Sequence, residues 1–273
     1  MVYIYGGGYH TGSIFKITHD ARYLAARGEV LVVMMNYRVG CLGWLYGGGG
    51  GDNGAAPANL GLADIHLALK WVHANGAHFG GDPSNVTLFG NSSGSVLTGL
   101  LLLSPATKGL FARVILQSGV PDSIRPAEEQ LAVTRKFAKE CGYEGGSSEA
   151  EMKEIVEFLK NKVSLETILA ATKAMDNPFR PVYGADELVP VRPIEVLRSG
   201  RYNADVDILY GVCRDEGGKK DLFENKKNLS KMFLSTCFSS SYQQAPSPLT
   251  SVLSWTTRRL SLQSSEQRRS SRN

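Results

Sequence analysis

Apolar runs rich in β-branched residues alternate with helical patterns along most of the chain. The strand-like runs occupy residues 2–5, 30–35, 86–89, 114–116 and 206–210. Helical stretches separate several of them, and strands that alternate with helices usually pair in parallel, because each crossover returns the chain to the same end of the sheet. The pattern therefore predicts an α/β fold, with a mostly parallel sheet flanked by helices.

The clearest helical pattern lies at residues 62–75. Leu62, Ile65, Leu69 and Val72 recur at three- and four-residue steps, with Trp71 beside them. This spacing places them on one side of a helix, so we expect that side to be buried. Two further stretches, residues 127–140 and 149–162, share the period but carry many charges. They are predicted to be surface helices beside the sheet.

The composition changes near residue 228. Of the last 46 residues 13 are serine, and six basic residues face a single acidic one. Apolar periodicity fades in the same stretch, which is typical of disorder. We therefore predict a folded unit over residues 1–227 and a disordered Ser/Arg-rich tail over residues 228–273. The tail shows no aromatic interleaving of its charges, so we assign no nucleic-acid role to it.

The sequence predicts no metal or cofactor site, no signal peptide and no transmembrane segment. The four cysteines have no metal-binding spacing, and the glycine run at residues 47–51 has no phosphate-loop lysine, so we expect no metal and no cofactor. The first residues lack a basic stretch followed by a long apolar one, so no signal peptide is expected. The longest apolar run, residues 96–103, is too short to span a bilayer, so no transmembrane segment is expected.

A strand-like run, a glycine-flanked serine and an apolar helical run follow one another at residues 86–103. Residues 90–94 read Gly-Asn-Ser-Ser-Gly. A strand that feeds a tight turn into a helix holds a serine hydroxyl clear of the sheet, as in a nucleophile elbow. The helix N-terminus favours negative charge, and the Ser93 amide would stabilise an oxyanion there. Ser92 is therefore a candidate nucleophile, with an ordinary loop serine as the alternative.

A second glycine-rich turn follows the first strand-like run. Residues 6–8 are all glycine, and their amides can approach a substrate oxygen closely because no side chain intervenes. Such a turn, upstream of an elbow serine, supplies oxyanion donors beside the amide that follows the nucleophile. The alternative is a tight turn that needs glycine only for its conformation.

Several further motifs stand in a recognisable order. They read YIYGGGY at residues 3–9, NYRVG at 36–40, NLGLAD at 59–64 and FGGDPSNVTLFG at 79–90, followed by QSG at 117–119 and RDEG at 214–217. In this order they resemble the type-B carboxylesterases and cholinesterases. The resemblance covers about residues 1–223 and implies a partial α/β-hydrolase fold, a fragment lacking both ends of the family's catalytic domain.

The resemblance also implies roles for individual residues. Ser92 would be the nucleophile that forms an acyl-serine, and the amides of Gly7, Gly8 and Ser93 would form the oxyanion hole. Glu216 would be the triad acid, which orients a histidine and stabilises its charged form. The implied partner is a small-molecule carboxylic ester. Family members of this kind are secreted or membrane-associated outside the cell, and the resemblance leaves the oligomeric state open.

The family's triad runs in the order serine, acid, histidine, but no histidine follows Ser92 in this sequence. The histidines are His10, His19, His66, His73 and His78, for which we expect surface or packing roles. We therefore expect impaired ester hydrolysis, so whether the chain is an active enzyme stays open. Two alternatives are a non-catalytic cholinesterase-like interaction module and a non-functional truncated isoform.

Three positions depart from the family's pattern. Asn91 stands where the family usually has glutamate, which makes a cationic choline ester a less favoured substrate, and Ser93 stands where it usually has alanine. Cys141 corresponds to one half of a family disulfide. The position implied for its partner is Phe158, so that bridge cannot form.

Overall fold

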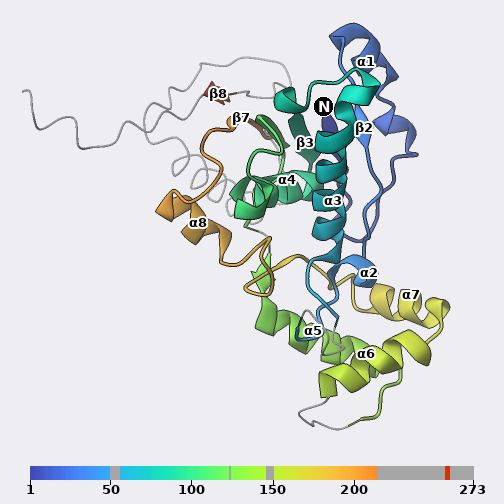
Figure 1. Cartoon of the computed structure of the whole chain (residues 1–273). Helices are drawn as coiled ribbons and strands as arrows, with labels where there is room; N and C mark the ends of the chain where they lie inside the picture. The colour runs from blue at the N-terminus through green and yellow to red at the C-terminus, as the bar shows by residue number, and fades with distance from the viewer. Residues whose placement is uncertain (50–55, 123, 146–150, 214–255, 259–273) are drawn as a thin grey trace, which may run out of the picture.

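The computed structural model of the chain describes residues 1–49, 56–122, 124–145, 151–213 and 256–258 (Figure 1). Within these residues a sheet runs in the strand order β2–β1–β3–β4–β7–β8. All neighbours pair in parallel except β7 and β8. The predicted α/β fold with a mostly parallel sheet is therefore confirmed. The strands are β1 (Val2–Ile4), β2 (Val33–Met34), β3 (Thr87–Asn91), β4 (Arg113–Gln117), β7 (Asp207–Gly211) and β8 (Thr256–Arg258).

Each predicted strand forms, but the one expected at residues 30–35 is much shorter. Only Val33 and Met34 pair with β1, opposite Val2 and Tyr3. The Met1 amino group donates to the Leu31 carbonyl oxygen at 2.6 Å. A strand of three residues such as β1 offers few ladder positions, so most of the apolar run at 30–35 stays outside the ladder.

Helix α3 (Leu60–Asn75) confirms the predicted amphipathic helix and begins two residues earlier than expected. Leu62, Ile65 and Leu69 are fully buried, and Val72 is nearly so. Trp71 lies at the edge of this side, half-exposed, with its ring centroid 5.7 Å from that of Phe79. The helical period therefore predicted the packed side correctly.

Helix α4 (Ser93–Leu103) is buried along its whole length and packs on β1, β3 and β4. An apolar helix with no polar side must be enclosed on all sides. Here the sheet and helix α8 (Pro193–Ser199) contact it. Because α4 directly follows β3, its N-terminus is fixed relative to the carboxyl ends of the central strands.

Helices α5, α6 and α7 group at one end of the molecule (Figure 1). They are α5 (Ala127–Glu140), α6 (Glu151–Asn161) and α7 (Leu165–Ala174), with a small parallel ladder of β5 (Arg125–Pro126) and β6 (Val182–Tyr183). The helix expected at 127–140 is confirmed, and α6 corresponds to the one expected at 149–162. The main contacts of α5 are with α6, α7 and this small ladder. The long connection between β4 and β7 thus builds a layer of its own, whereas we had expected helices beside the main sheet.

The remaining elements are short. They are α1 (Arg22–Gly28), α2 (Cys41–Trp44) and the 3-10 turns η1 (Ile17–His19), η2 (Gly76–Phe79), η3 (Pro83–Asn85) and η4 (Pro105–Thr107). No helix among the described residues is long and apolar enough to cross a membrane. In the predicted tail, residues 228–255 and 259–273 lie outside the described residues, while β8 pairs with β7. The division at residue 228 stays a prediction.

Candidate active site

Ser92 joins β3 to α4 in a backbone conformation that side chains rarely adopt. Its φ is 56° and its ψ is −126°, which costs about 1–3 kcal/mol for a residue with a Cβ. Two hydrogen bonds fix it: its amide donates to the Gln117 carbonyl oxygen at 2.8 Å, and its own carbonyl oxygen accepts from the Val96 amide at 3.1 Å. Ser92 is exposed. The turn therefore presents this serine outside the packed sheet.

The two glycines that flank the elbow allow close backbone approaches. A Cβ on Gly90 would lie 2.4 Å from the Gly94 carbonyl oxygen, and a Cβ on Gly94 would lie 2.2 Å from that of Ile4. Both distances are too short for any side chain. The two glycines thus allow the tight bend and the close contact between helix and strand.

The glycine turn after β1 lies directly beside Ser92. A Cβ on Gly6 would be 3.0 Å from the Ser92 Cβ and 2.5 Å from the Asn91 carbonyl oxygen. Gly7 and Gly8 have φ values of 137° and 62°, which glycine adopts readily. Among the described residues neither of these two amides donates a hydrogen bond. They are therefore free to bind an acceptor.

Hydrogen bonds support the glycine turn, and the sequence patterns predicted no role for the residues that make them. The Tyr9 carbonyl oxygen accepts from the Trp44 Nε1 and from the Gly40 amide, both at 2.8 Å. Tyr5 and Tyr37 exchange hydrogen bonds between their hydroxyls and carbonyl oxygens, at 2.6 and 3.2 Å. Burial raises the pKa of both phenols, so they stay protonated and keep donating. No local periodicity could have revealed these hydrogen bonds, because they join two separate stretches of the chain, residues 5–9 and 37–44.

The strand order explains why these parts meet. The chain leaves β1 toward β2 on one side, whereas β3 continues to β4 on the other. Ligand sites of open α/β sheets lie outside the carboxyl ends of the strands, at such a reversal. Ser92 follows β3, and Gly6 to Gly8 follow β1, its direct neighbour. Ser92 and the glycine turn therefore lie at the carboxyl ends of neighbouring strands, beside this reversal.

Ser93 begins α4, so its amide has no acceptor within the helix and lies at the positive end of the helix dipole. Its side chain is buried, and its hydroxyl oxygen has no hydrogen-bond partner among the described residues. Position 93 thus combines an available amide with an unsatisfied hydroxyl.

Glu216 lies outside the described residues. The last described part before it is Cys213, which follows β7 by two residues and whose Sγ lies 4.0 Å from the Ser118 Oγ. Since β7 runs parallel to β4 and β4 to β3, the carboxyl end of β7 lies at the same edge of the sheet as Ser92.

None of the five histidines, all in the described part of the chain, hydrogen-bonds to Ser92. The His10 Nδ1 lies 2.9 Å from the Gly8 carbonyl oxygen, and the His19 Nδ1 lies 2.9 Å from that of Ser13. His66 is buried in α3, with its Nε2 3.1 Å from the Ala106 carbonyl oxygen. His73 and His78 lie at the end of α3 and in η2. The described residues also hold no cluster of His, Cys, Asp and Glu that could bind a metal.

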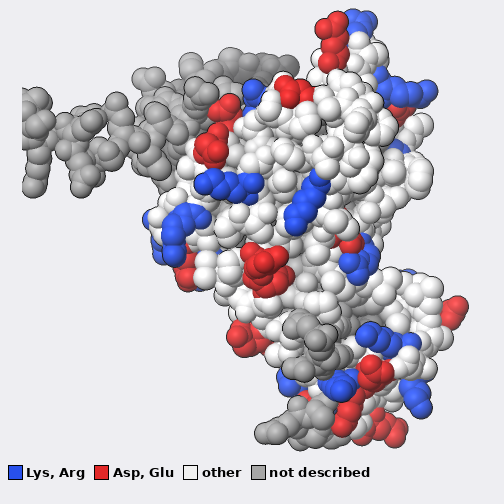
Figure 2. All heavy atoms as spheres, in the orientation of Figure 1, with Lys and Arg blue, Asp and Glu red and all other residues white. Residues whose placement is uncertain are grey.

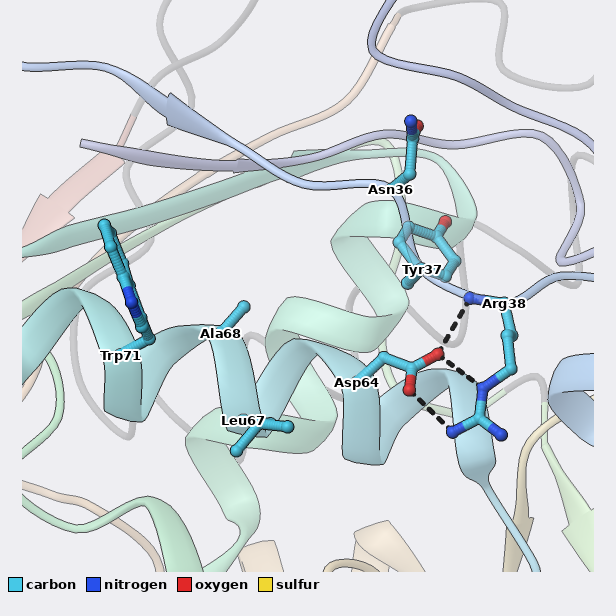
Figure 3. Close-up of a pocket in the computed structure, with 7 residues that line it drawn as sticks. All are labelled: Asn36, Tyr37, Arg38, Asp64, Leu67, Ala68 and Trp71. Atoms are coloured by element: carbon cyan, nitrogen blue, oxygen red, sulfur yellow. Dashed lines mark hydrogen bonds and ion pairs between the residues drawn. The ribbon is translucent and has the colours of Figure 1, made fainter.

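A separate surface depression of about 570 Å³ lies along α3 (Figure 3). Its charged residues, Arg38 and Asp64, are already paired. The Arg38 amide and Nε donate to one carboxylate oxygen at 2.9 and 2.8 Å, and its Nη2 donates to the other at 2.6 Å. The remaining walls include Leu67 and Trp71. The pair fastens the loop after β2 to α3 and leaves no free charged group for a ligand.

Comparisons with known proteins show the family to which the sequence is similar. The sequence profile described as "Carboxylesterase family" matches residues 1–272. "Cholinesterase 1" of Branchiostoma lanceolatum is 38% identical over 230 residues, which are 80% of this chain and 62% of that protein. "Acetylcholinesterase" of Danio rerio is 40% identical over 226 residues, 80% of this chain and 34% of that protein. "Cholinesterase" of Mus musculus is 39% identical over 226 residues, 80% and 36% respectively. The chain thus spans between about one third and three fifths of the length of these curated relatives.

Proposed function

This chain belongs to the carboxylesterase family, and from that premise we propose that Ser92 is the nucleophile of a serine carboxylic-ester hydrolase. The observation that carries the proposal is the conformation of Ser92, strained and exposed at the carboxyl end of β3, beside the glycine turn after β1. Strained backbone conformations of this kind cost free energy and are found mainly at functional sites. The Ser92 hydroxyl attacks the ester carbonyl and forms an acyl-serine.

The amides of Gly7, Gly8 and Ser93 are proposed to stabilise the oxyanion of the tetrahedral intermediate. Two observations support this: the Gly7 and Gly8 amides donate no hydrogen bond among the described residues, and the Ser93 amide is the first of a helix. Each such donor contributes about 3–4 kcal/mol at the transition state. Glu216 is proposed as the acid that orients the general base.

A polypeptide of these 273 residues is proposed to hydrolyse esters weakly, because no histidine follows Ser92 in it. The base that removes the serine proton accounts for a factor on the order of a million in turnover in a serine hydrolase. Without a base, acylation and deacylation both slow. The oxyanion donors and the positioning of the ester remain, so a small Ser92-dependent rate should persist.

The substrate is proposed to be a small carboxylic ester. At position 91 an asparagine stands beside the nucleophile, and its amide supplies no negative charge for a cationic alcohol group. The names of the relatives, which are cholinesterases, support an ester substrate without fixing its alcohol. We propose that the whole protein lies outside the cell, secreted or attached to a membrane.

An alternative is a non-catalytic interaction module, and the lack of a histidine after Ser92 favours it. Exposed apolar side chains offer a surface for such a role: Phe15 is 85% and Ile17 91% exposed. The retained, strained Ser92 argues against it, since a binding module has no need of an elbow serine.

The test is hydrolysis of p-nitrophenyl acetate by the purified chain, with and without added imidazole. Imidazole supplies the missing base from solution, so it should raise the rate of the natural sequence above that of Ser92→Ala at each concentration. The variant serves as the matched control, because imidazole also hydrolyses the ester unaided. Equal rates for the two proteins at every imidazole concentration would refute the proposal and favour the binding module.

A further inference from the structure

The imidazole of His10 lies directly against the glycine turn after β1. Its Nδ1 lies 2.9 Å from the Gly8 carbonyl oxygen. A Cβ on Gly8 would lie 2.7 Å from the His10 Cε1 and 3.0 Å from its Nδ1, so the ring fills the space beside the Gly8 Cα. His10 is exposed. The ring is therefore held at the turn by its hydrogen bond more than by burial in the core.

The chemistry of this hydrogen bond decides which ring nitrogen carries the proton. A carbonyl oxygen accepts hydrogen bonds and cannot donate them, so the His10 Nδ1 must be the donor. In the neutral ring the Nε2 is then without a proton. The doubly protonated ring also carries a proton on Nδ1. The imidazole can therefore donate to the Gly8 carbonyl oxygen in either charge state.

The neighbouring carbonyl oxygens of the turn accept from other donors. That of Gly7 accepts from the His10 and Thr11 amides at 3.3 and 3.1 Å, and that of Tyr9 accepts from the two donors described above. Among the described residues, the Gly8 carbonyl oxygen has the His10 side chain as its donor. The backbone thus fixes one side of Gly8, and the imidazole fixes the other.

Both sides matter for the direction of the Gly8 amide. A trans peptide unit points its carbonyl oxygen and its amide hydrogen in opposite directions, so the bonds to the Gly7 carbonyl oxygen aim the Gly8 amide away from the His10 and Thr11 amides. Gly8 has a φ of 62° and no Cβ, so it rotates easily. Rotation at Gly8 is restrained only when the next peptide unit is also held, which is what the imidazole does.

We propose that His10 is a positioning residue for the oxyanion hole, because its imidazole keeps the Gly8 amide in the orientation that binds the oxyanion. The inference rests on the proposed function, in which the Gly8 amide is one of the donors. Such a donor acts on charge that develops in the transition state and contributes less to binding of the uncharged ester. Loss of the imidazole should therefore lower kcat and leave KM nearly unchanged.

The kinetic test compares His10→Leu with His10→Asn in the full chain. The two new side chains have similar size, but only asparagine carries a nitrogen that can donate from the position of the histidine Nδ1. The rate measured is hydrolysis of p-nitrophenyl acetate at fixed imidazole concentration, after subtraction of the rate of Ser92→Ala. We expect His10→Leu to lower kcat about tenfold, less than the loss of a whole oxyanion donor. His10→Asn should retain most of kcat.

His73→Leu is the matched control, because it removes another exposed imidazole, from α3, and should leave kcat unchanged. Circular dichroism shows whether each variant folds, and His10→Ala provides a second variant should His10→Leu not fold. Equal kcat values for His10→Leu and the natural sequence would overturn the inference. An equal loss of kcat in His10→Leu and His10→Asn would overturn it as well, since the donor would then not be what matters.

A second measurement needs no activity and separates this inference from the proposed function. Isotope labelling of the histidine and glycine nitrogens lets NMR spectroscopy identify the protonated ring nitrogen and follow the Gly8 amide. We expect neutral His10 to carry its proton on Nδ1, and the Gly8 amide signal to broaden or double in His10→Leu but not in His10→Asn. A proton on Nε2, or an unchanged Gly8 signal in His10→Leu, would overturn the positioning role. Absence of Ser92-dependent hydrolysis in the natural sequence, with these NMR results as expected, would refute only the proposed function.

Discussion

At the scale of single residues, the elbow is a strained position held by its neighbours. Ser92 keeps a positive φ because the Gln117 carbonyl oxygen accepts from its amide and α4 begins at the next residue. Ser93 carries a second cost, since its buried hydroxyl has no partner among the described residues. Both costs fall at the proposed reaction centre, where strain and unsatisfied groups tend to gather.

Replacement of Ser93 by alanine should therefore stabilise the protein. An unsatisfied buried hydroxyl costs about 1–3 kcal/mol, and alanine is also the better helix former. We expect the free energy of unfolding, measured in urea, to rise by about 1 kcal/mol. Ser95→Ala is the matched control, because the Ser95 Oγ donates to the Gly119 carbonyl oxygen at 2.8 Å. Ser95→Ala should lower the free energy of unfolding by a similar amount. A lower free energy of unfolding in both variants would contradict the explanation for Ser93.

His66 should make stability depend on pH. Burial, helped by the charge of Lys70, lowers the pKa of this histidine below its usual 6.5, although the Ala106 carbonyl oxygen and Glu187 act in the other direction. The unfolded chain then binds more protons than the folded one, so stability is full above pH 6.5 and falls as the pH drops below it. We expect a smaller loss in His66→Gln between pH 7.5 and 5.5, measured by urea unfolding. Equal losses in both proteins would disprove the role of His66.

At the scale of elements, α4 lies against β1 with no side chain between the two backbones. Gly94 makes this possible, because a Cβ there would lie 2.2 Å from the Ile4 carbonyl oxygen and 2.6 Å from that of Tyr5. Since β1 leads into the glycine turn, this contact sets the spacing between the two proposed sources of oxyanion donors.

Gly94→Ala should destabilise the fold although alanine favours helix. A contact of 2.2 Å forces α4 away from β1, and overpacking of this kind costs about 1–3 kcal/mol or more. Gly76→Ala is the comparison: Gly76 has a φ of −54°, and a Cβ added there would have a Val72 methyl carbon as its nearest neighbour, at 4.0 Å. That change should be neutral or stabilising by up to about 1 kcal/mol. Thermal unfolding of the two variants tests this prediction, and equal Tm values for Gly94→Ala and Gly76→Ala would contradict it.

Local patterns were sufficient for elements that form through short-range periodicity. The buried side of α3 and the strand-turn-helix around Ser92 follow from the spacing of Leu62, Ile65 and Leu69 and from the glycines at 90 and 94. Contacts between distant segments produce no local sequence pattern of this kind. The bond from Trp44 to the Tyr9 carbonyl oxygen joins residues 35 positions apart, and the helical layer of α5 to α7 depends on tertiary packing that no single period encodes.

At the scale of the whole molecule, the candidate site is assembled from segments that only the sheet brings together. β1 and β3 are far apart in the chain but adjacent in the sheet, and their carboxyl ends carry the glycine turn and Ser92. Acidic and basic side chains are interspersed over the face shown in Figure 2. The site therefore depends on strand order and backbone conformation.

The central claim is that Ser92 is a nucleophile. Transfer of an acyl group to Ser92 can be detected directly. Deacylation also needs the base, so the acyl-serine should accumulate once formed. The chain is incubated with p-nitrophenyl acetate without imidazole, so that no added base speeds deacylation, and is then digested and examined by peptide mass spectrometry. We predict one acetyl group on Ser92, absent from Ser92→Ala and from the natural sequence unfolded in urea. Acetylation confined to lysines, or equal labelling of Ser92 in the folded and unfolded chain, would contradict the claim.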